Sequence, residues 1–140
     1  MSADVVCVGA LLVNAQGEVL LQQRDDKPHL NYPGHWTTLG GKVETGETPD
    51  EAMRRELLEE IELEPEMRLW KVFDNPVGHG GIIVEQHFYV GHIDLPASEI
   101  TLNEGQALAF FGLDDLAAMP IAFGFEPVFR EFFMQQANRI

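Results

Sequence analysis

Apolar residues recur in short runs along this chain, and such runs are typical of β-strands. They predict strands over residues 4–13, 18–23, 36–39, 67–75, 82–93 and 107–112. The first run is almost uninterrupted, which predicts a strand that is buried on both faces. Turn and loop residues separate the strands, so we expect a polar loop over residues 24–35, a glycine turn at Gly40 and Gly41, and a flexible connection over residues 78–81.

Two stretches repeat with the period of a helix instead. The first covers about residues 49–62. Its start is marked by a hydroxyl at the N-cap, a proline at the first helical position and a capping box, supplied by Thr48, Pro49 and Glu51. The second covers residues 126–138, where phenylalanines at helical spacing predict a core stripe formed by Phe125, Phe129, Phe132 and Phe133.

The helix over residues 49–62 is expected to carry two opposite faces. One is an apolar stripe for the core, formed by Met53, Leu57, Leu58 and Ile61. The other is an arc of carboxylates, formed by Glu56, Glu59 and Glu60. Neighbouring carboxylates repel one another, and a hard divalent cation with oxygen ligands would turn that repulsion into attraction. A fully solvated acidic face is the alternative interpretation, and the helix alone does not decide between the two.

Strands around two helices predict a compact α+β sandwich in a single domain over residues 1–140. The chain has 9 basic and 23 acidic residues, so its formal net charge is −14. A protein with this balance is poorly suited to bind a long nucleic acid, because such binding is built from Lys and Arg on phosphates. A small phosphorylated substrate is compatible with it, provided that metal ions neutralise the charge between two negative partners.

The only cysteine is Cys7, so an internal disulfide is excluded. Its apolar setting between Val6 and Val8 indicates a core residue rather than a nucleophile. The apolar run at the N-terminus is too short to span a bilayer and has no basic region before it. The sequence therefore predicts a soluble, cytoplasmic protein without a membrane partner.

One long spacing pattern connects the two glycines to the acidic helix. It runs from Gly41 through Glu47 to the consecutive residues Arg55, Glu56, Leu57, Leu58, Glu59, Glu60 and Ile61, and it ends on Leu63. This pattern resembles the Nudix box, the signature of the Nudix hydrolases. Every position matches but one, because Glu62 stands where the family has a glycine. Glycine there would supply a left-handed C-cap, so the departure concerns how the helix ends.

The resemblance implies a fold, a reaction and a cofactor. The fold is the Nudix fold, an α/β/α sandwich with a mixed β-sheet. The reaction is hydrolysis of a nucleoside diphosphate linked to a further group X, as in a nucleotide, an oxidised nucleotide or a nucleotide sugar. The cofactor is Mg²⁺, with Mn²⁺ as the alternative, because a few carboxylates hold such an ion against substrate phosphates and leave coordination positions open.

The resemblance also implies roles for residues of the box. The metal ligands would be the carbonyl oxygen of Gly41 and the carboxylates of Glu56, Glu59 and Glu60. Arg55 would orient the carboxylates through a fork-like contact shared with Glu47. The general base stays open between Glu56 and Glu59, so the expected catalytic residues are Glu56, Glu59 and Arg55.

Outside the box, three residues resemble positions of MutT-type Nudix enzymes. Glu104 lies in a run similar to the segment that adds a loop glutamate to the metal site, and a solvated loop glutamate is the alternative. Arg24 follows the second strand, where these enzymes place a basic residue on phosphate, and an ordinary surface arginine is the alternative.

Phe125 bears on the choice of base. It occupies the position at which the enzyme that clears 8-oxo-dGTP carries an asparagine that reads the oxidised base. A ring stacks on a base but does not make those paired hydrogen bonds. We therefore expect Arg24 and Phe125 to contact a nucleotide, with 8-oxo-dGTP disfavoured.

Two functions of different classes stay open as hypotheses. The first is the Mg²⁺-dependent pyrophosphohydrolase, and the second is a non-catalytic nucleotide- or metal-binding module with the Nudix fold. The intact set of Arg55 and its neighbouring glutamates favours the enzyme, because non-catalytic members often lose those charges. An isomerase of isoprenoid diphosphates shares the fold but would need a cysteine near the substrate, and Cys7 is expected to be buried. Many Nudix enzymes are dimers, and nothing in the sequence decides for or against a homodimer.

Overall fold

The computed structural model describes residues 4–77 and 82–137, and strand β1 (Val5–Val13) lies at the centre of its sheet. Along its whole length β1 pairs in parallel with β6 (Ile82–His92). It also pairs antiparallel with β4 (Leu39–Lys42) and, at its end, with β2 (Val19–Gln23). The sheet is therefore mixed, as predicted.

The remaining strands extend this sheet on both sides. β5 (Arg68–Val77) pairs antiparallel with β6. Both β3 (Trp36–Thr37) and β7 (Ala107–Phe111) pair antiparallel with β2. The main path through the seven strands runs β3-β2-β1-β6-β5, with β4 and β7 attached to β1 and β2.

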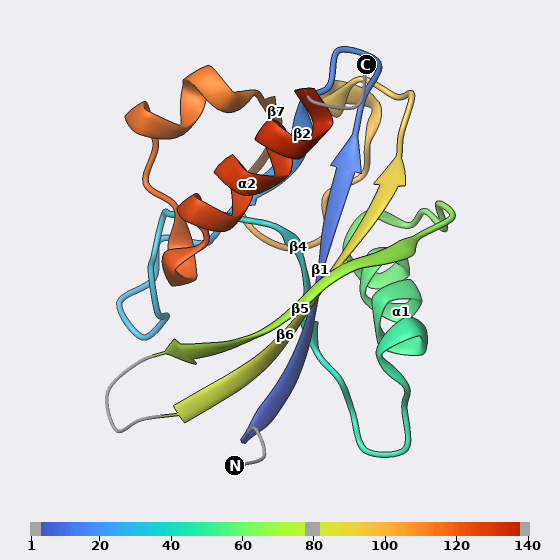
Figure 1. Ribbon diagram of the computed structural model, residues 1–140, viewed down its shortest axis with the longest axis vertical. Coiled ribbons are helices and arrows are strands. Elements are labelled where there is room, and N and C mark those ends of the chain that lie inside the picture. The colour runs from blue at the N-terminus through green and yellow to red at the C-terminus, as the bar shows by residue number, and fades with distance from the viewer. Residues whose placement is uncertain (1–3, 78–81, 138–140) are drawn as a thin grey trace.

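Helices cover the two faces of the sheet, as Figure 1 shows for α1 (Pro49–Ile61) in green and α2 (Glu126–Ala137) in red. Alternate residues of β1 contribute to two separate cores, because successive side chains of a strand point to opposite faces. Leu12 packs with the α1 core and Leu11 with the α2 core. The predicted phenylalanine stripe lies in the α2 core, formed by Phe125, Phe129, Phe132 and Phe133.

Short 3₁₀ turns complete the fold, over Ala97–Glu99 (η1), Leu113–Ala118 (η2) and Ala122–Gly124 (η3). The predicted strands are all present, and their ends differ from the prediction by no more than two residues. The predicted flexible connection over residues 78–81 lies outside the described residues. Within the described ranges, no helix is long and apolar enough to cross a membrane.

The glycine turn predicted at Gly40 and Gly41 is wrong, because both residues lie within strand β4. They pair with Gly9 and Val8 of β1. A Cβ atom on Gly40, whose φ is +150°, would lie 2.0 Å from the carbonyl oxygen of Val8. Only glycine lets β4 approach β1 this closely, so these residues are needed for strand contact rather than for a turn.

Helix α1 begins as predicted, and the residue that caps its end takes a backbone conformation that is unfavourable for a glutamate. Thr48 Oγ1 accepts a hydrogen bond from the Glu51 N–H at 3.2 Å, and the Glu51 carboxylate accepts one from the Thr48 N–H at 2.8 Å. At the other end Glu62 is left-handed, with φ 59° and ψ 33°. Its N–H donates to the Leu58 carbonyl at 3.1 Å. A glutamate thus takes the backbone conformation for which the family pattern has glycine.

The two opposite faces predicted for α1 are wrong at two positions. Leu58 is 41% exposed and lies outside the core, whereas Glu60 is 1% exposed. At 3.6 residues per turn, Glu60 falls on the same side of the helix as Met53 and Leu57, and Leu58 lies about 100° further round than Leu57. The buried side of the helix therefore includes a carboxyl group, and the backbone N–H of Gly40 in β4 donates a hydrogen bond to it.

Candidate active site

Strand β4 and helix α1 contact each other, and this contact brings Gly41 against Glu56. A Cβ atom on Gly41 would lie 2.5 Å from Glu56 Oε1, so glycine leaves the room that this carboxylate occupies. The loop between the two elements is closed by a hydrogen bond from the Glu44 N–H to Glu47 Oε1 at 2.9 Å. The local sequence therefore places a glycine backbone and an acidic helix side by side.

The Arg55 guanidinium lies at the centre of this arrangement. Two of its nitrogens donate to the Glu47 carboxylate at 2.7 and 3.0 Å, which is the fork-like contact that the sequence predicts. Its Nη1 donates to Glu56 at 3.0 Å and to Glu59 at 3.3 Å. Its Nη2 donates to the carbonyl of Lys42 at 3.0 Å. Arg55 thus joins the helix, the loop and strand β4, and it lowers the pKa of Glu47 chiefly through their hydrogen bond.

Glu56 is partly buried and Glu60 is fully buried. The side chain of Glu56 is 13% exposed, and burial raises its pKa against the opposing effect of Arg55. Both oxygens of Glu60 face the N–H of Gly40, at 2.9 and 3.2 Å. Burial raises the pKa of Glu60 to about 8 despite this hydrogen bond, and nearby carboxylates add to the rise. Carboxyl groups are therefore concentrated where little water reaches them, and this burial favours their neutral forms.

Glu59 and Glu104 are the exposed members of the group. The side chain of Glu59 is 58% exposed, and Arg55 is its partner in the described structure. Glu104 lies in the loop before β7, and the charge of Glu104 adds to the burial that raises the pKa values of Glu56 and Glu60. The structure therefore gathers the carboxylates predicted for the metal site within electrostatic reach of one another.

The donors in this group suit a hard divalent cation, because they are carboxylate oxygens beside the glycine backbone of β4. Within residues 4–77 and 82–137, no three His, Cys, Asp or Glu side chains are grouped closely enough to hold a metal ion as they stand. The hydrogen bonds explain this, because Arg55 holds Glu56 and Glu59 while the N–H of Gly40 faces Glu60. The side chain of Glu59 is 58% exposed, and the donor set of carboxylate and backbone oxygens fits the chemistry of Mg²⁺.

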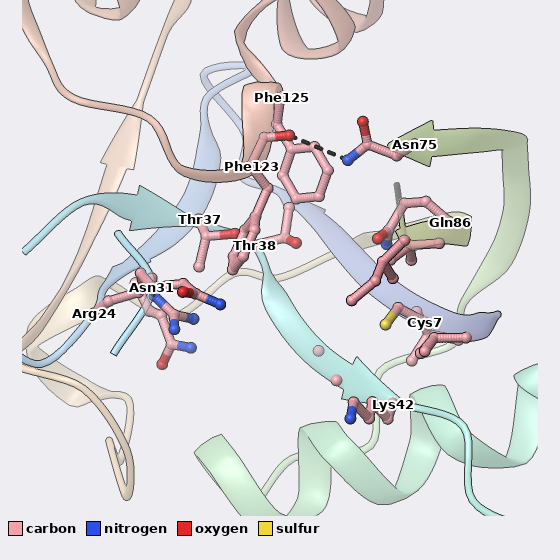
Figure 2. Close-up of a pocket in the computed structure, with 17 residues that line it drawn as sticks. Cys7, Arg24, Asn31, Thr37, Thr38, Lys42, Asn75, Gln86, Phe123 and Phe125 are labelled. Carbon is pink, nitrogen blue, oxygen red and sulfur yellow. Dashed lines mark hydrogen bonds between the residues drawn. The ribbon is translucent and has the colours of Figure 1, made fainter. Parts of the chain in front are cut away.

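A pocket of about 420 Å³ opens beside the glycines of β4. Figure 2 shows Lys42 at its α1 end and the rings of Phe123 and Phe125 at the other. Hydroxyl and amide side chains line the walls between these ends, contributed by Asn31, Thr37, Thr38, Asn75 and Gln86. Aromatic rings with a few polar groups are typical of a small-molecule site.

Both substrate residues predicted from the sequence line this pocket. The guanidinium carbon of Arg24 lies 4.9 Å from the centroid of the Phe123 ring, and its Nε donates to the carbonyl of Asn31 at 2.9 Å. Phe125 is 4% exposed and packs edge-on against Phe88, with ring centroids 5.0 Å apart. Phe125 therefore belongs both to the core stripe and to the pocket wall.

Sequence reasoning missed Asn75, Gln86 and Phe123. Asn75 Nδ2 donates to the carbonyl of Phe123 at 3.1 Å, which holds the segment before α2 in place, and Phe123 has φ 60° (Figure 2). Gln86 is 5% exposed although it lies between Glu85 and His87 in strand β6. The run of three polar residues gives no sign that the middle one is buried, so the sequence offers no signal for Gln86.

Cys7 is not the core residue that the sequence predicts. It is partly exposed and lines the pocket, because β1 is fully buried only from Val8 onward. The pocket thus contains the thiol that an isomerase would need. Burial raises the pKa of this thiol, with an opposing effect from Lys42, so the neutral form prevails and the group is a poor nucleophile.

Comparison with protein families decides the assignment. The model described as the NUDIX domain matches residues 4–132. The chain belongs to the Nudix hydrolases. The recognition made from the box is confirmed, and so are the predicted α+β class and the Nudix fold. As a Nudix hydrolase, the protein belongs to a class of enzymes that act on phosphoric anhydrides.

Several proteins are similar to this Nudix hydrolase over different shares of its length. The CTP pyrophosphohydrolase of Escherichia coli (strain K12) is 28% identical over 94% of this chain and 94% of its own length. The RNA pyrophosphohydrolase of Gluconacetobacter diazotrophicus is 46% identical, but over 39% of this chain. This chain spans about a third of the length of the RNA pyrophosphohydrolases it matches. A crystal structure described as a MutT NUDIX hydrolase from Burkholderia pseudomallei is 29% identical, with a TM-score of 0.73 and coverage of 91% of this chain and 95% of that one.

Proposed function

We propose that this Nudix hydrolase is a Mg²⁺-dependent pyrophosphohydrolase of nucleoside triphosphates or related nucleoside diphosphate conjugates. The observation that carries this proposal is one continuous pocket. Its ring-lined end at Phe123 and Phe125 suits a base, and its other end reaches Gly41, which lies against Glu56. A nucleotide seated along the pocket would therefore bring its phosphates to the acidic helix.

The residues of the box have separate tasks in this proposal. Glu56, Glu59, Glu60 and the carbonyl of Gly41 would hold Mg²⁺, which supplies charge neutralisation at the phosphates when it is bound. Arg55 holds Glu47 and Glu56 in place through charge-assisted hydrogen bonds. Either Glu56 or Glu59 accepts a proton from the attacking water. The oxygen of this water bonds to phosphorus while the anhydride P–O bond breaks. Glu104 adds a carboxylate from outside the helix.

The pocket itself would supply affinity and selection. Arg24 and Lys42 are cations within it, in a chain whose net charge is −14. Lys42 lies at the α1 end and would attract the substrate's phosphates, whereas Arg24 lies beside the Phe123 ring and would contact the nucleotide nearer its base. The amides of Asn75 and Gln86 would hydrogen-bond the polar edge of the base, while Phe125 contacts its face.

The extent of the similarities favours a free nucleotide over an RNA end. The resemblance to the CTP pyrophosphohydrolase covers nearly the whole of both chains. The resemblance to RNA pyrophosphohydrolases covers less than half of this chain. Free nucleoside triphosphates are therefore our first choice of substrate.

The test is release of the products of anhydride cleavage from a panel of substrates, with Mg²⁺ and with chelator. These products are pyrophosphate with a monophosphate from the triphosphates, and a nucleoside monophosphate with a sugar phosphate from the nucleoside diphosphate conjugates. The panel comprises the NTPs and dNTPs, oxidised dNTPs, ADP-ribose, nucleotide sugars and a short 5′-triphosphorylated RNA. We expect chelator-sensitive hydrolysis of one nucleotide class. Glu59→Gln should lower that turnover by at least about 100-fold without loss of folding, because its side chain is exposed.

The control for this variant is Glu64→Gln, which removes one charge from an exposed glutamate beyond the helix. It should turn over substrate normally. Metal-dependent nucleotide binding without hydrolysis of any panel member would overturn the enzyme proposal in favour of the binding module. Normal turnover by Glu59→Gln would show that the metal assignment is wrong.

A further inference from the structure

The loop that carries Glu104 is attached to the end of helix α1 through Asn103. The backbone N–H of Asn103 donates to the carbonyl of Glu60 at 2.9 Å. Its side-chain Nδ2 donates to the carbonyl of Glu59 at 2.9 Å and to Glu62 Oε2 at 3.0 Å. The last carbonyls of a helix lack partners within the helix, and here two of them belong to expected metal-binding residues.

Glu62 is the acceptor in this contact that does not belong to the helix backbone. Its backbone is left-handed, and its side-chain Oε2 accepts a hydrogen bond from the side-chain amide of Asn103. A glycine at this position would relieve the backbone but would provide no acceptor. The one residue of the box that departs from the family pattern thus contacts the loop through its side chain, whereas Glu59 and Glu60 contact it through their backbone carbonyls.

The same loop is attached on its other side to strand β2. The N–H of Gln106 donates to the carbonyl of Gln23, and its Nε2 donates to the carbonyl of Arg24, each at 2.8 Å. Gly105 has φ +84°, and a Cβ atom there would lie 2.6 Å from the carbonyl oxygen of Gln23. Glu104 is therefore held between the end of α1 and the end of β2, one residue after Asn103 and two residues before Gln106.

We propose that Glu62 and Asn103 are positioning residues that hold Glu104 at the carboxylate group of α1. The inference rests on the proposed Mg²⁺-dependent function, in which Glu104 adds an oxygen near the ion. The two hydrogens of the Asn103 side-chain NH₂ have separate acceptors, so this group has no donor left over. Loss of either acceptor would let the loop turn and would move Glu104.

A positioning role and a purely structural role predict opposite results for Glu62→Gly. Removing the left-handed glutamate should leave the melting temperature unchanged or raise it by a few degrees. It should also weaken Mn²⁺ binding and raise the Mg²⁺ concentration needed for half-maximal turnover, each by about 10-fold, as is typical for residues that orient metal ligands. Glu62→Gln keeps a carbonyl acceptor and should remain close to wild type.

The experiment measures Mn²⁺ affinity by electron paramagnetic resonance and Mg²⁺ dependence by turnover. The variants are Glu62→Gly, Glu62→Gln and Asn103→Ala, each also combined with Glu104→Gln. Glu64→Gln, which removes a nearby exposed charge, is the matched control and should behave as wild type. If Glu62 and Asn103 act through Glu104, their effects should vanish in the Glu104→Gln background.

Two outcomes would overturn this inference alone. One is Mn²⁺ affinity and Mg²⁺ dependence of Glu62→Gly equal to those of an active wild type. The other is a loss in Glu62→Gly that persists in full in the Glu104→Gln background. A wild type that neither binds Mn²⁺ nor hydrolyses a nucleotide would overturn the proposed function and this inference together.

Discussion

Both carboxylate oxygens of Glu60 face a single backbone N–H, that of Gly40, at 2.9 and 3.2 Å. This residue is 1% exposed, so one donor replaces the water that would otherwise solvate the charge. Burial accordingly raises its pKa to about 8. In the metal-free protein Glu60 is therefore largely protonated at neutral pH, and a bound cation would favour the ionised form.

The first prediction concerns the stability of the metal-free protein. Because the folded pKa of Glu60 lies above its unfolded value, its contribution is fully present below about pH 4.3 and is lost as pH rises through about 8. Over this pH range the free energy of unfolding should fall by at most about 5 kcal/mol. Chemical denaturation in chelator at several pH values between 4.5 and 9 measures it.

The control for that series is Glu60→Gln, which is uncharged at every pH. It should lack the part of the pH dependence that Glu60 contributes, and its stability relative to wild type should improve as pH rises. Added Mg²⁺ should restore wild-type stability at pH 8 to 9 and should have less effect on Glu60→Gln. An equal slope of stability with pH in both proteins would contradict the assignment.

The second prediction concerns the planar fork of Arg55. Lysine keeps the charge but cannot donate to both oxygens of Glu47 while also reaching Glu56 and Lys42. We expect Arg55→Lys to lower kcat/KM on the order of 10- to 100-fold with little loss of folded protein. Steady-state kinetics and a thermal melt measure the two effects.

The neighbouring Arg54 provides the matched control for this change. Arg54 is exposed on the same helix, so Arg54→Lys should leave both kcat/KM and the melting temperature unchanged. Equal kinetics for Arg55→Lys and wild type would show that charge alone suffices at this position.

The contacts within the acidic half of the candidate site follow from the sequence because that half is local. Gly41, Glu47 and Arg55 lie within one continuous segment, and the caps of α1 fix where its side chains point. The prediction for Glu60 was wrong because the polarity of its side chain, and not the helical period, assigned it to the solvent side. The N–H of Gly40, supplied by a neighbouring strand, gives this buried carboxyl group a hydrogen-bond donor.

The residues of the pocket could not be predicted from the sequence in the same way. Asn75, Gln86 and Phe123 meet through pairing of β5 with β6 and through the segment before α2. These contacts join residues far apart in the chain, so no short spacing marks them. Cys7 was misplaced for a related reason, since an apolar run shows that a strand is buried but not where burial begins.

The third prediction concerns Gln86 as a residue that selects the substrate. Leucine has a similar volume and no hydrogen-bonding groups, so Gln86→Leu should preserve the buried strand and remove the proposed hydrogen bond to the base. We expect KM to rise about 10-fold with kcat changed less than about 2-fold, which is the signature of binding shared by ground state and transition state.

Gln16→Leu serves as the control for that change, because Gln16 lies in an exposed turn outside the pocket. Its kinetics should match those of the wild type. A fall in kcat for Gln86→Leu with KM unchanged would place Gln86 in the chemistry rather than in substrate selection.

The last prediction uses Cys7, which is the only thiol of the chain and lines the pocket. Because burial raises its pKa, we expect iodoacetamide to modify it at least about 10-fold more slowly than free glutathione at pH 7.5. A nucleotide that occupies the pocket should slow the reaction further by covering the sulfur. Mass spectrometry over time measures both rates, with glutathione in the same nucleotide solution as the control for the reagent. If saturating nucleotide left the rate at Cys7 unchanged while it was being hydrolysed, the substrate would bind elsewhere, and the pocket would lose its place in the proposal.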